Sequence, residues 1–252
     1  AEVNAIKMAG SDKTKGSTVY VTLEPCSHYG KTPPCSDLLI QSEVNKVVIA
    51  SVDPNPLVAG KGIEKLRKAG IEVELGICQE EALALNQVFF HILKTNQPYV
   101  TLKTAASLDG KTATHAYESK WITGAEARLD VHQYRHQHDA ILVGVGTVLA
   151  DNPSLTTRLP NGGKNPIRII LDTQLRTPLH AKVVTDGEAP TWIITGTNRD
   201  LEKVAALENK HGVRVLSLPS LKVDIPLLLS LLGKEGVTSL FVEGGATVNG
   251  SF

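Results

Sequence analysis

The chain alternates β-branched apolar runs with stretches of helical periodicity, and this alternation restricts the fold more than any other feature of the sequence. Alternation of this kind is typical of layered α/β domains with a mostly parallel sheet. In the first part of the chain, the remainder of a helix ends at Gly10, and strands are expected at residues 17–23, 46–51 and 71–75. Further helices are expected there at residues 35–42, 63–68 and 79–95.

The second part of the chain repeats the alternation with different residues. Strands are expected at residues 99–105, 140–143, 167–172, 191–195, 213–218 and 239–242. Helices are expected at residues 125–136, 201–210 and 225–232. Between the two parts stands Pro98, and the residue before a proline is disfavoured in a helix. We therefore predict two α/β domains, residues 1–97 and residues 98–252.

The composition is that of a globular chain, with 42% hydrophobic and 21% charged residues. Because 26 Lys and Arg balance 26 Asp and Glu, the chain has no basic excess for nucleic acid, and a small-molecule substrate fits better. Three cysteines are too few for a disulfide framework, and no apolar run approaches the ~18 residues of a membrane span. We expect a cytoplasmic protein without a membrane partner. Ala1 lies inside a helical pattern and Phe252 follows a glycine-rich turn, so we interpret the chain as truncated at both ends.

A small group of residues in the first domain has the chemistry of a zinc site. Cys26 follows Pro25 directly after the first expected strand, and Cys35 opens the next expected helix. Free N–H groups at a helix start favour the thiolate form of a cysteine, which is the form that binds metal. Glu2 supplies a carboxylate that can move protons without being a ligand.

The run TLEPCSHYGKTPPC, residues 22–35, resembles the zinc-binding segment of the cytidine-deaminase-like superfamily, and in particular the longer form found in riboflavin-pathway deaminases. The resemblance implies an αβα deaminase domain in which Cys26 and Cys35 bind Zn²⁺, together with a histidine expected just before Ala1. It also implies that zinc lowers the pKa of bound water, that Glu2 takes the proton, and that Glu2 later delivers it to the departing ammonia.

The second domain carries glycine turns after two expected strands. Gly144 and Gly146 follow one strand, and Leu149 stands where a dinucleotide-binding fingerprint needs its third glycine. Gly244 and Gly245 follow the last strand, ahead of an expected helix start suited to phosphate. A nucleotide-binding fold other than the Rossmann fold is therefore expected.

The segments 102–113, 119–124, 141–153, 167–173 and 241–251 resemble the reductase domain of the bifunctional riboflavin enzyme, which has a dihydrofolate-reductase-like fold. The resemblance implies contacts to NADPH from Ala105, Trp121, Thr147, Asp151, Thr173 and the stretch 245–251, which begins with Gly245. It implies contacts to the sugar-phosphate substrate from Ser119, Arg135, Leu155, Arg158 and Glu243. Arginine suits such a role because its guanidinium pairs with phosphate oxygens in bidentate fashion. Nearest the hydride-transfer centre we expect Lys103, Asp151 and Glu243.

The resemblance therefore implies two consecutive steps of riboflavin synthesis. The first is a zinc-dependent hydrolytic deamination of a diamino-ribosylamino-pyrimidinone phosphate, and the second is the NADPH-dependent reduction of its ribosyl group to ribityl. It also suggests a homo-oligomer. The alternative is a reductase alone, with an inactive first domain. A non-catalytic zinc module is less favoured, because structural zinc sites want four protein ligands.

Overall fold

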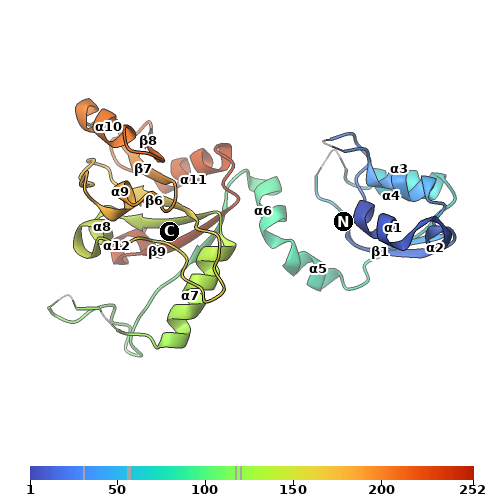
Figure 1. Ribbon diagram of the computed structural model, residues 1–252, viewed down its shortest axis with the longest axis horizontal. Coiled ribbons are helices and arrows are strands. Elements are labelled where there is room, and N and C mark those ends of the chain that lie inside the picture. Colours follow the sequence, from blue (N-terminus) through green and yellow to red (C-terminus); the bar gives the residue numbers. More distant parts are fainter. Residues whose placement is uncertain (31, 56–57, 117, 120) are drawn as a thin grey trace. The chain divides into compact units, whose positions relative to one another are not determined.

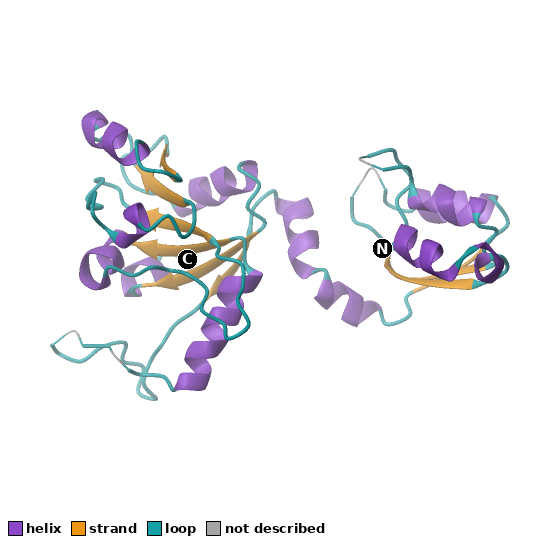
Figure 2. Cartoon of the chain, in the orientation of Figure 1, coloured by secondary structure: helices purple, strands orange, loops and turns teal. Residues whose placement is uncertain are grey.

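The computed structural model describes residues 1–30, 32–55, 58–116, 118–119 and 121–252. The chain forms two compact units, Ala1–Lys94 and Thr95–Phe252. Each unit has its own parallel sheet covered by helices, as the ribbon in Figure 1 and the colouring in Figure 2 show. The predicted α/β class is therefore confirmed for both parts. None of the helices in the described residues combines the length and apolarity that a bilayer crossing requires.

The first unit is built on a three-stranded parallel sheet in the order β1-β2-β3. Its strands are β1 (Thr18–Leu23), β2 (Lys46–Ser51) and β3 (Glu72–Leu75). Its helices are α1 (Glu2–Ala9), α2 (Ser11–Thr14), α3 (Cys35–Gln41), α4 (Lys61–Lys68), α5 (Gln79–Leu85) and α6 (Gln87–Thr95).

One face of this sheet carries the core of the first unit. Leu39 of α3 and Leu66 of α4 are fully buried against Val47 and Ile49 of β2. These two strand residues are two apart and therefore point to the same face. Ile6 of α1 packs against the same cluster, so three helices with apolar stripes cover one face of the sheet.

The second unit is built on a six-stranded parallel sheet in the order β4-β9-β5-β6-β7-β8. Its strands are β4 (Tyr99–Leu102), β5 (Ala140–Gly144), β6 (Ile167–Leu171), β7 (Thr191–Thr195), β8 (Val213–Ser217) and β9 (Ser239–Gly244). Its helices are α7 (Ala125–Gln137), α8 (Val145–Asp151), α9 (Lys182–Thr185), α10 (Leu201–Glu208), α11 (Ile225–Lys234) and α12 (Ala246–Asn249).

Both faces of the larger sheet are buried, which explains why its strands are apolar without alternation. Ile141 and Phe241 belong to a cluster on one face, with side chains from α8, α9 and α10. Leu142 and Leu240 belong to the cluster on the other face, with side chains from α11. The last strand in the sequence, β9, lies between β4 and β5, so the carboxyl ends of these three strands meet at one edge.

The structure differs from the expected elements in four places, apart from shifts of one or two residues at the ends of other elements. The helix expected at residues 79–95 is two helices, because Asn86 leaves the helical conformation between α5 and α6. The strand expected at 99–105 ends at Leu102. The short helices α2 and α9 were not expected, since four residues are too few for a helical period to be recognised in the sequence.

Candidate active sites

The structure brings Glu2, Cys26 and Cys35 together. The backbone N–H of Cys35 donates to the sulfur of Cys26 over 3.2 Å. The Glu2 carboxylate and Cys26 are also close enough to the Cys35 thiol to shift its pKa. The three residues predicted for the deaminase half therefore form one cluster, with α1 contributing the carboxylate and the start of α3 contributing one thiol.

Contrary to what the position of Cys35 in the sequence had suggested, the start of α3 does not lower the pKa of its thiol. Burial, together with the nearby Glu2 carboxylate and Cys26, raises the pKa of the Cys35 thiol to about 12. The backbone N–H of Cys35, at the start of α3, donates to the sulfur of Cys26 and not to the Cys35 sulfur. The thiol of Cys35 is therefore protonated at neutral pH, and a metal ion that binds it has to displace the proton.

A buried carboxylate holds the segment that carries Cys26. Glu24 is 4% exposed and accepts hydrogen bonds from the backbone N–H groups of Gly60 and Gly62, both over 2.9 Å, with longer bonds from Asp53 and Ile63. Two of these groups belong to the first turn of α4, where unpaired N–H groups favour a negative charge. This clamp fixes the strand end before Cys26 against the start of α4.

Two residues of this cluster, Cys26 and Cys35, fit zinc as ligands. Thiolate sulfur is a preferred zinc donor, and the Cys26 sulfur lies 3.2 Å from the backbone N of Cys35, whose own thiol is affected by Cys26. No group of three or more His, Cys, Asp or Glu placed to hold a metal occurs within the part of the chain that the structure describes. Cys26 and Cys35 therefore supply a pair of donors, and Glu2 lies beside them.

The second unit has a cavity of about 740 Å³ at the carboxyl edge of its sheet. Predicted residues that line it are Lys103, Ala105, Ser119, Trp121, Arg135, Thr147, Asp151, Leu155, Glu243 and Gly245. These residues come from the ends of β4 and β9, from α7 and α8, and from loops far apart in the sequence. The structure thus gathers them around one cavity.

Arg135 and Glu243 are paired with each other in this cavity. The Nε and Nη2 atoms of Arg135 donate to the two carboxylate oxygens of Glu243 over 2.5 and 2.8 Å, and Nη1 donates to the Thr156 carbonyl over 2.8 Å. Leu142 of β5 pairs with Val242, but the next residue pairs with Gly244, so Glu243 occupies a β-bulge. A bulge redirects a side chain, and here it accompanies the pairing of Glu243 with α7. The bidentate fork expected for phosphate is engaged by a carboxylate.

Two other predicted residues lie elsewhere. Arg158 lines a neighbouring hollow of about 300 Å³ that shares Lys103, Arg135 and Glu243 with the larger cavity. Thr173 follows β6 and is not among the residues that line either hollow; its hydroxyl accepts a hydrogen bond from the N–H of Val223 over 3.4 Å. Contact between Thr173 and NADPH stays a prediction.

The glycines of the two turns have different surroundings. A Cβ atom on Gly144 would lie 2.8 Å from the side chain of Val248, so Gly144 allows close packing of α12 rather than close approach of a ligand. Gly146 has open space around it. Gly245 lines the cavity with a left-handed φ of 51°, a conformation that glycine adopts most readily.

The cavity also offers polar groups suited to a nucleotide. The Oδ1 atom of Asn249, in the stretch predicted to contact NADPH, is buried and has no hydrogen-bond partner among the described residues. The guanidinium of Arg128 lies 4.3 Å from the ring centroid of Trp121, which is 72% exposed. The same cavity thus offers an acceptor for a hydrogen-bond donor and a ring-stacked cation for negative charge, which fits a polar, anionic cofactor.

Sequence reasoning missed Arg128 and His132 of α7. Both line the smaller hollow together with Arg135. The signal was available, because residues four and seven positions after Arg128 share its helix face. It was not used because each basic residue alone is more often a solvated surface side chain.

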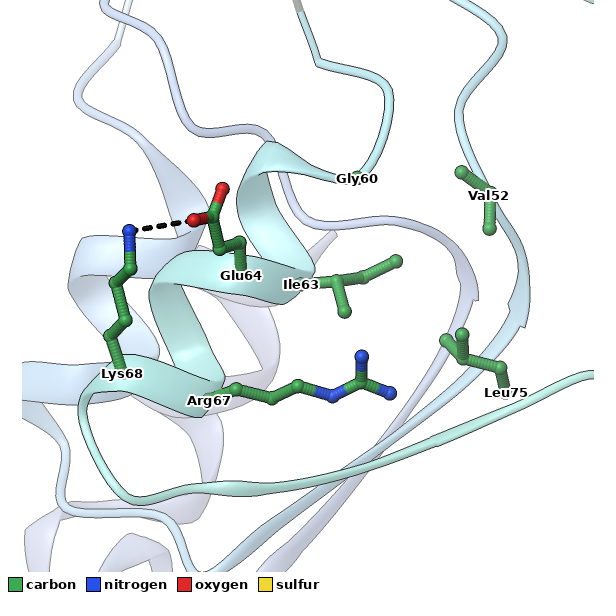
Figure 3. A pocket seen from close by; sticks show the side chains of 7 residues that line it. All are labelled: Val52, Gly60, Ile63, Glu64, Arg67, Lys68 and Leu75. Carbon is green, nitrogen blue, oxygen red and sulfur yellow. Dashed lines mark ion pairs between the residues drawn. The ribbon is translucent and has the colours of Figure 1, made fainter.

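A further hollow lies on the first unit, away from the predicted residues. Figure 3 shows Ile63 and Arg67 of α4 facing Val52 and Leu75, with Glu64 and Lys68 paired on the outer side of the helix. None of the predicted catalytic or binding residues lines this hollow.

Two family models match the chain. The model described as "RibD C-terminal domain" matches residues 98–252. The model described as "Cytidine and deoxycytidylate deaminase zinc-binding region" matches residues 1–51.

Relatives named riboflavin biosynthesis protein RibD match the whole chain. The protein from Bacillus amyloliquefaciens is 57% identical over 252 residues, which cover 100% of this chain and 67% of that protein. The protein from Escherichia coli K12 is 45% identical over 266 residues, with 100% of this chain and 70% of that protein covered. The chain thus spans about two thirds of the length of these relatives.

Two solved structures have the same fold as the chain. A diaminohydroxyphosphoribosylaminopyrimidine deaminase/5-amino-6-(5-phosphoribosylamino)uracil reductase from Thermotoga maritima aligns with a TM-score of 0.82 and 39% identity, covering 100% of this chain and 68% of that one. The second form of Acinetobacter baumannii RibD aligns with a TM-score of 0.84 and 43% identity, covering 100% and 69%.

Proposed function

The chain belongs to the family of the riboflavin biosynthesis protein RibD, and from that membership we propose that its own residues carry two consecutive reactions, a deamination and a reduction. At the level of the family, the predictions of fold and function are confirmed. The chain has a deaminase-like α/β domain followed by a reductase domain, and the family is bifunctional, acts in riboflavin biosynthesis and uses zinc and NADPH.

For the deaminase half we propose that Cys26 and Cys35 hold zinc and that Glu2 moves the protons. Zinc, when bound, supplies Lewis-acid activation of water. The carboxylate of Glu2 acts electrostatically on the Cys35 thiol and is 16% exposed, which puts a proton acceptor near the two sulfurs. A carboxylate in this position can accept a proton from water and return it to the leaving amine. The observation that carries this proposal is the contact between Glu2 and Cys35.

For the reductase half we propose that the 740 Å³ cavity binds both the cofactor and the sugar-phosphate substrate. NADPH, when bound, supplies the hydride. Lys103 follows β4, and its backbone is held on both sides, since its N–H donates to Val242 over 2.9 Å and its carbonyl accepts from Asn249 over 3.3 Å. A lysine fixed at the cavity wall can protonate or polarise the ribose oxygen, and this is the role we assign to Lys103.

The remaining cavity residues bind and orient in this proposal. Asp151, at the end of α8, lies near both the cofactor and the reacting ribose. Trp121, Thr147, Ala105, Gly245 and Thr173 contact NADPH, while Ser119, Arg135, Leu155, Arg158 and Glu243 contact the substrate. Since the carboxylate of Glu243 already engages two donors of Arg135, this pair would act as one rigid element of the substrate site.

The organisation of the protein follows the same proposal. We assign the deaminase to residues 1–97 and the reductase to residues 98–252, and we propose a pyrimidine ribosyl phosphate as the substrate. A homo-oligomer is proposed from the family resemblance. A cytoplasmic location is proposed because all three cysteines are free thiols, as a reducing compartment keeps them.

The experiment that tests the proposal supplies the intact protein with the diaminopyrimidinone ribosyl phosphate and NADPH. Ammonia release followed by NADPH oxidation supports both assignments. NADPH oxidation that needs the deaminated compound, without any ammonia release, would restrict the function to the reductase.

A further inference from the structure

Two histidines of α7 hold the segment that carries Arg158. The backbone N–H of Arg158 donates to Nδ1 of His132 over 3.2 Å. The backbone N–H of Lys164 donates to Nδ1 of His136 over 2.9 Å. His132 and His136 are one helical turn apart, so the loop between α8 and β6 is fastened to α7 by two successive histidines.

Only the first of these two attachments lies at the proposed substrate site. His132 is half-buried and lines the 300 Å³ hollow together with Arg158. His136 is exposed and is not among the residues that line this hollow. The two bonds are alike in chemistry and differ in place, so each serves as a control for the other.

The position of the Arg158 guanidinium depends on its backbone. Within the described residues its side chain makes one long hydrogen bond, from Nη1 to the Thr156 hydroxyl over 3.5 Å. A bond of that length is weak and restrains the side chain little. The attachment of the Arg158 backbone to His132 is therefore the backbone restraint nearest to this cation, and the bond from Arg135 to the Thr156 carbonyl acts two residues earlier.

The hydrogen bond from the Arg158 N–H to His132 requires a neutral imidazole, because a protonated ring has no lone pair to accept it. Burial lowers the pKa of His132, and the positive charges of Arg135 and Arg158 lower it further. The Glu243 carboxylate and a hydrogen bond with the Thr156 backbone raise this pKa, but by less. Lys103 and Arg128 line the same hollow and add positive charge. The charged groups facing the ring thus favour the form that can accept.

We propose that His132 is a positioning residue of the reductase site, whose neutral ring holds the Arg158 backbone and thereby aims the guanidinium at the phosphate group of the substrate. The proposal rests on the substrate-binding role of Arg158. It makes substrate affinity sensitive to acid, because protonation of His132 removes the attachment.

Three variants separate the parts of this proposal. In His132→Asn the side-chain oxygen occupies the δ position of the imidazole acceptor and does not titrate. His132→Leu removes the acceptor. His136→Leu removes the matching bond outside the hollow. For each variant, KM and kcat for the aminouracil ribosyl phosphate are measured with saturating NADPH between about pH 5 and about pH 8.

We expect His132→Leu to raise KM about tenfold, the factor that corresponds to ~1.4 kcal/mol, with kcat changed less than about twofold. His132→Asn should restore the KM of the wild type at neutral pH. The substrate phosphate titrates near pH ~6, so an acid rise of KM is expected in both proteins from that source. The part of the acid effect that His132 causes is the amount by which KM rises more in the wild type than in His132→Asn. His136→Leu should follow the wild type.

An unchanged KM in His132→Leu, an acid profile of His132→Asn equal to that of the wild type, or an equal effect of His136→Leu would overturn the proposal. A readout without turnover is the binding of inorganic phosphate, followed by NMR of the intact protein. His132→Leu should weaken phosphate binding about tenfold, and unchanged binding would also overturn the proposal. Loss of NADPH oxidation in the wild type would instead contradict the assigned function, while the phosphate measurement would still test His132.

Discussion

Arg135 and Glu243, which lie 108 residues apart in the sequence, form a bidentate ion pair in which each side chain is 10% exposed. The pair joins α7 to the bulged end of β9. It also takes up two donors of the guanidinium that sequence reasoning had expected to grip a phosphate. Such a pair fixes geometry more than it adds stability, because burying both charges costs nearly as much as their attraction returns.

Breaking this pair should destabilise the second unit. Glu243→Gln leaves Arg135 buried without its counter-charge, and we expect a loss of about 3–5 kcal/mol in the free energy of unfolding. Trp121 and Trp192, the two tryptophans of the chain, both lie in the second unit, so urea unfolding followed by tryptophan fluorescence reports on that unit.

The control for Glu243→Gln is Glu235→Gln, which breaks an ion pair with Arg214 at 2.9 Å between partly exposed side chains. Exposed pairs of this kind contribute at most about 1 kcal/mol. Equal stability of the two variants would show that the Arg135–Glu243 pair is not buried as described.

Glu2→Gln should abolish ammonia release while zinc stays bound. The amide keeps the shape of the side chain but cannot accept a proton from water. Zinc content by metal analysis and ammonia release are measured on the same sample. Glu64→Gln, which alters an exposed carboxylate paired with Lys68, should leave both unchanged. Ammonia release retained in Glu2→Gln would remove Glu2 from the catalytic group.

Lys103→Ala should lower the kcat of NADPH oxidation by about 10²-fold, the usual size of a general-acid contribution. Lys111→Ala is the matched control, since Lys111 lies eight positions further along the chain and pairs at the surface with Asp109. Its kcat should stay within about twofold of the wild type. If both variants turned over like the wild type, Lys103 would have no part in the chemistry.

Gly62→Ala should weaken both folding and zinc binding. A Cβ atom at Gly62 would lie 2.1 Å from the carbonyl oxygen of Pro25 and 3.2 Å from Glu24, so the segment before Cys26 would have to move. We expect a loss of about 1–3 kcal/mol in the free energy of unfolding, together with weaker zinc binding in a chelator competition. Gly30→Ala lies between the two cysteines but has open space, and it should change stability by less than about 0.5 kcal/mol. Equal stability and equal zinc binding of the two variants would contradict the claim that Glu24 and the start of α4 hold the segment before Cys26.

The strands could be predicted from the sequence because buried parallel strands are unbroken β-branched runs. The bounds expected for β2 and β7 match those of the structure. The break at Asn86 could not be predicted, since the apolar period continues across it from α5 into α6.

Contacts that depend on tertiary structure also could not be predicted from the sequence. Arg168 would be expected at a strand surface, yet it is 1% exposed and bonds Asp186 and the carbonyls of Ser154 and Ala189. Likewise, the expected thiolate of Cys35 followed from its helix position alone, whereas burial beside Glu2 raises its pKa. The ion pair and the histidine attachments have no local sequence signal, because their members are far apart along the chain.

The central claim is that one chain combines a zinc-dependent deaminase with an NADPH-dependent reductase. The most direct test measures ammonia release and NADPH oxidation by the intact protein with the diaminopyrimidinone phosphate, with and without a zinc chelator. We predict that the chelator stops ammonia release, and that NADPH oxidation then continues only when the deaminated compound is supplied. Ammonia release that resists the chelator, or that is absent from the untreated protein, would contradict the claim.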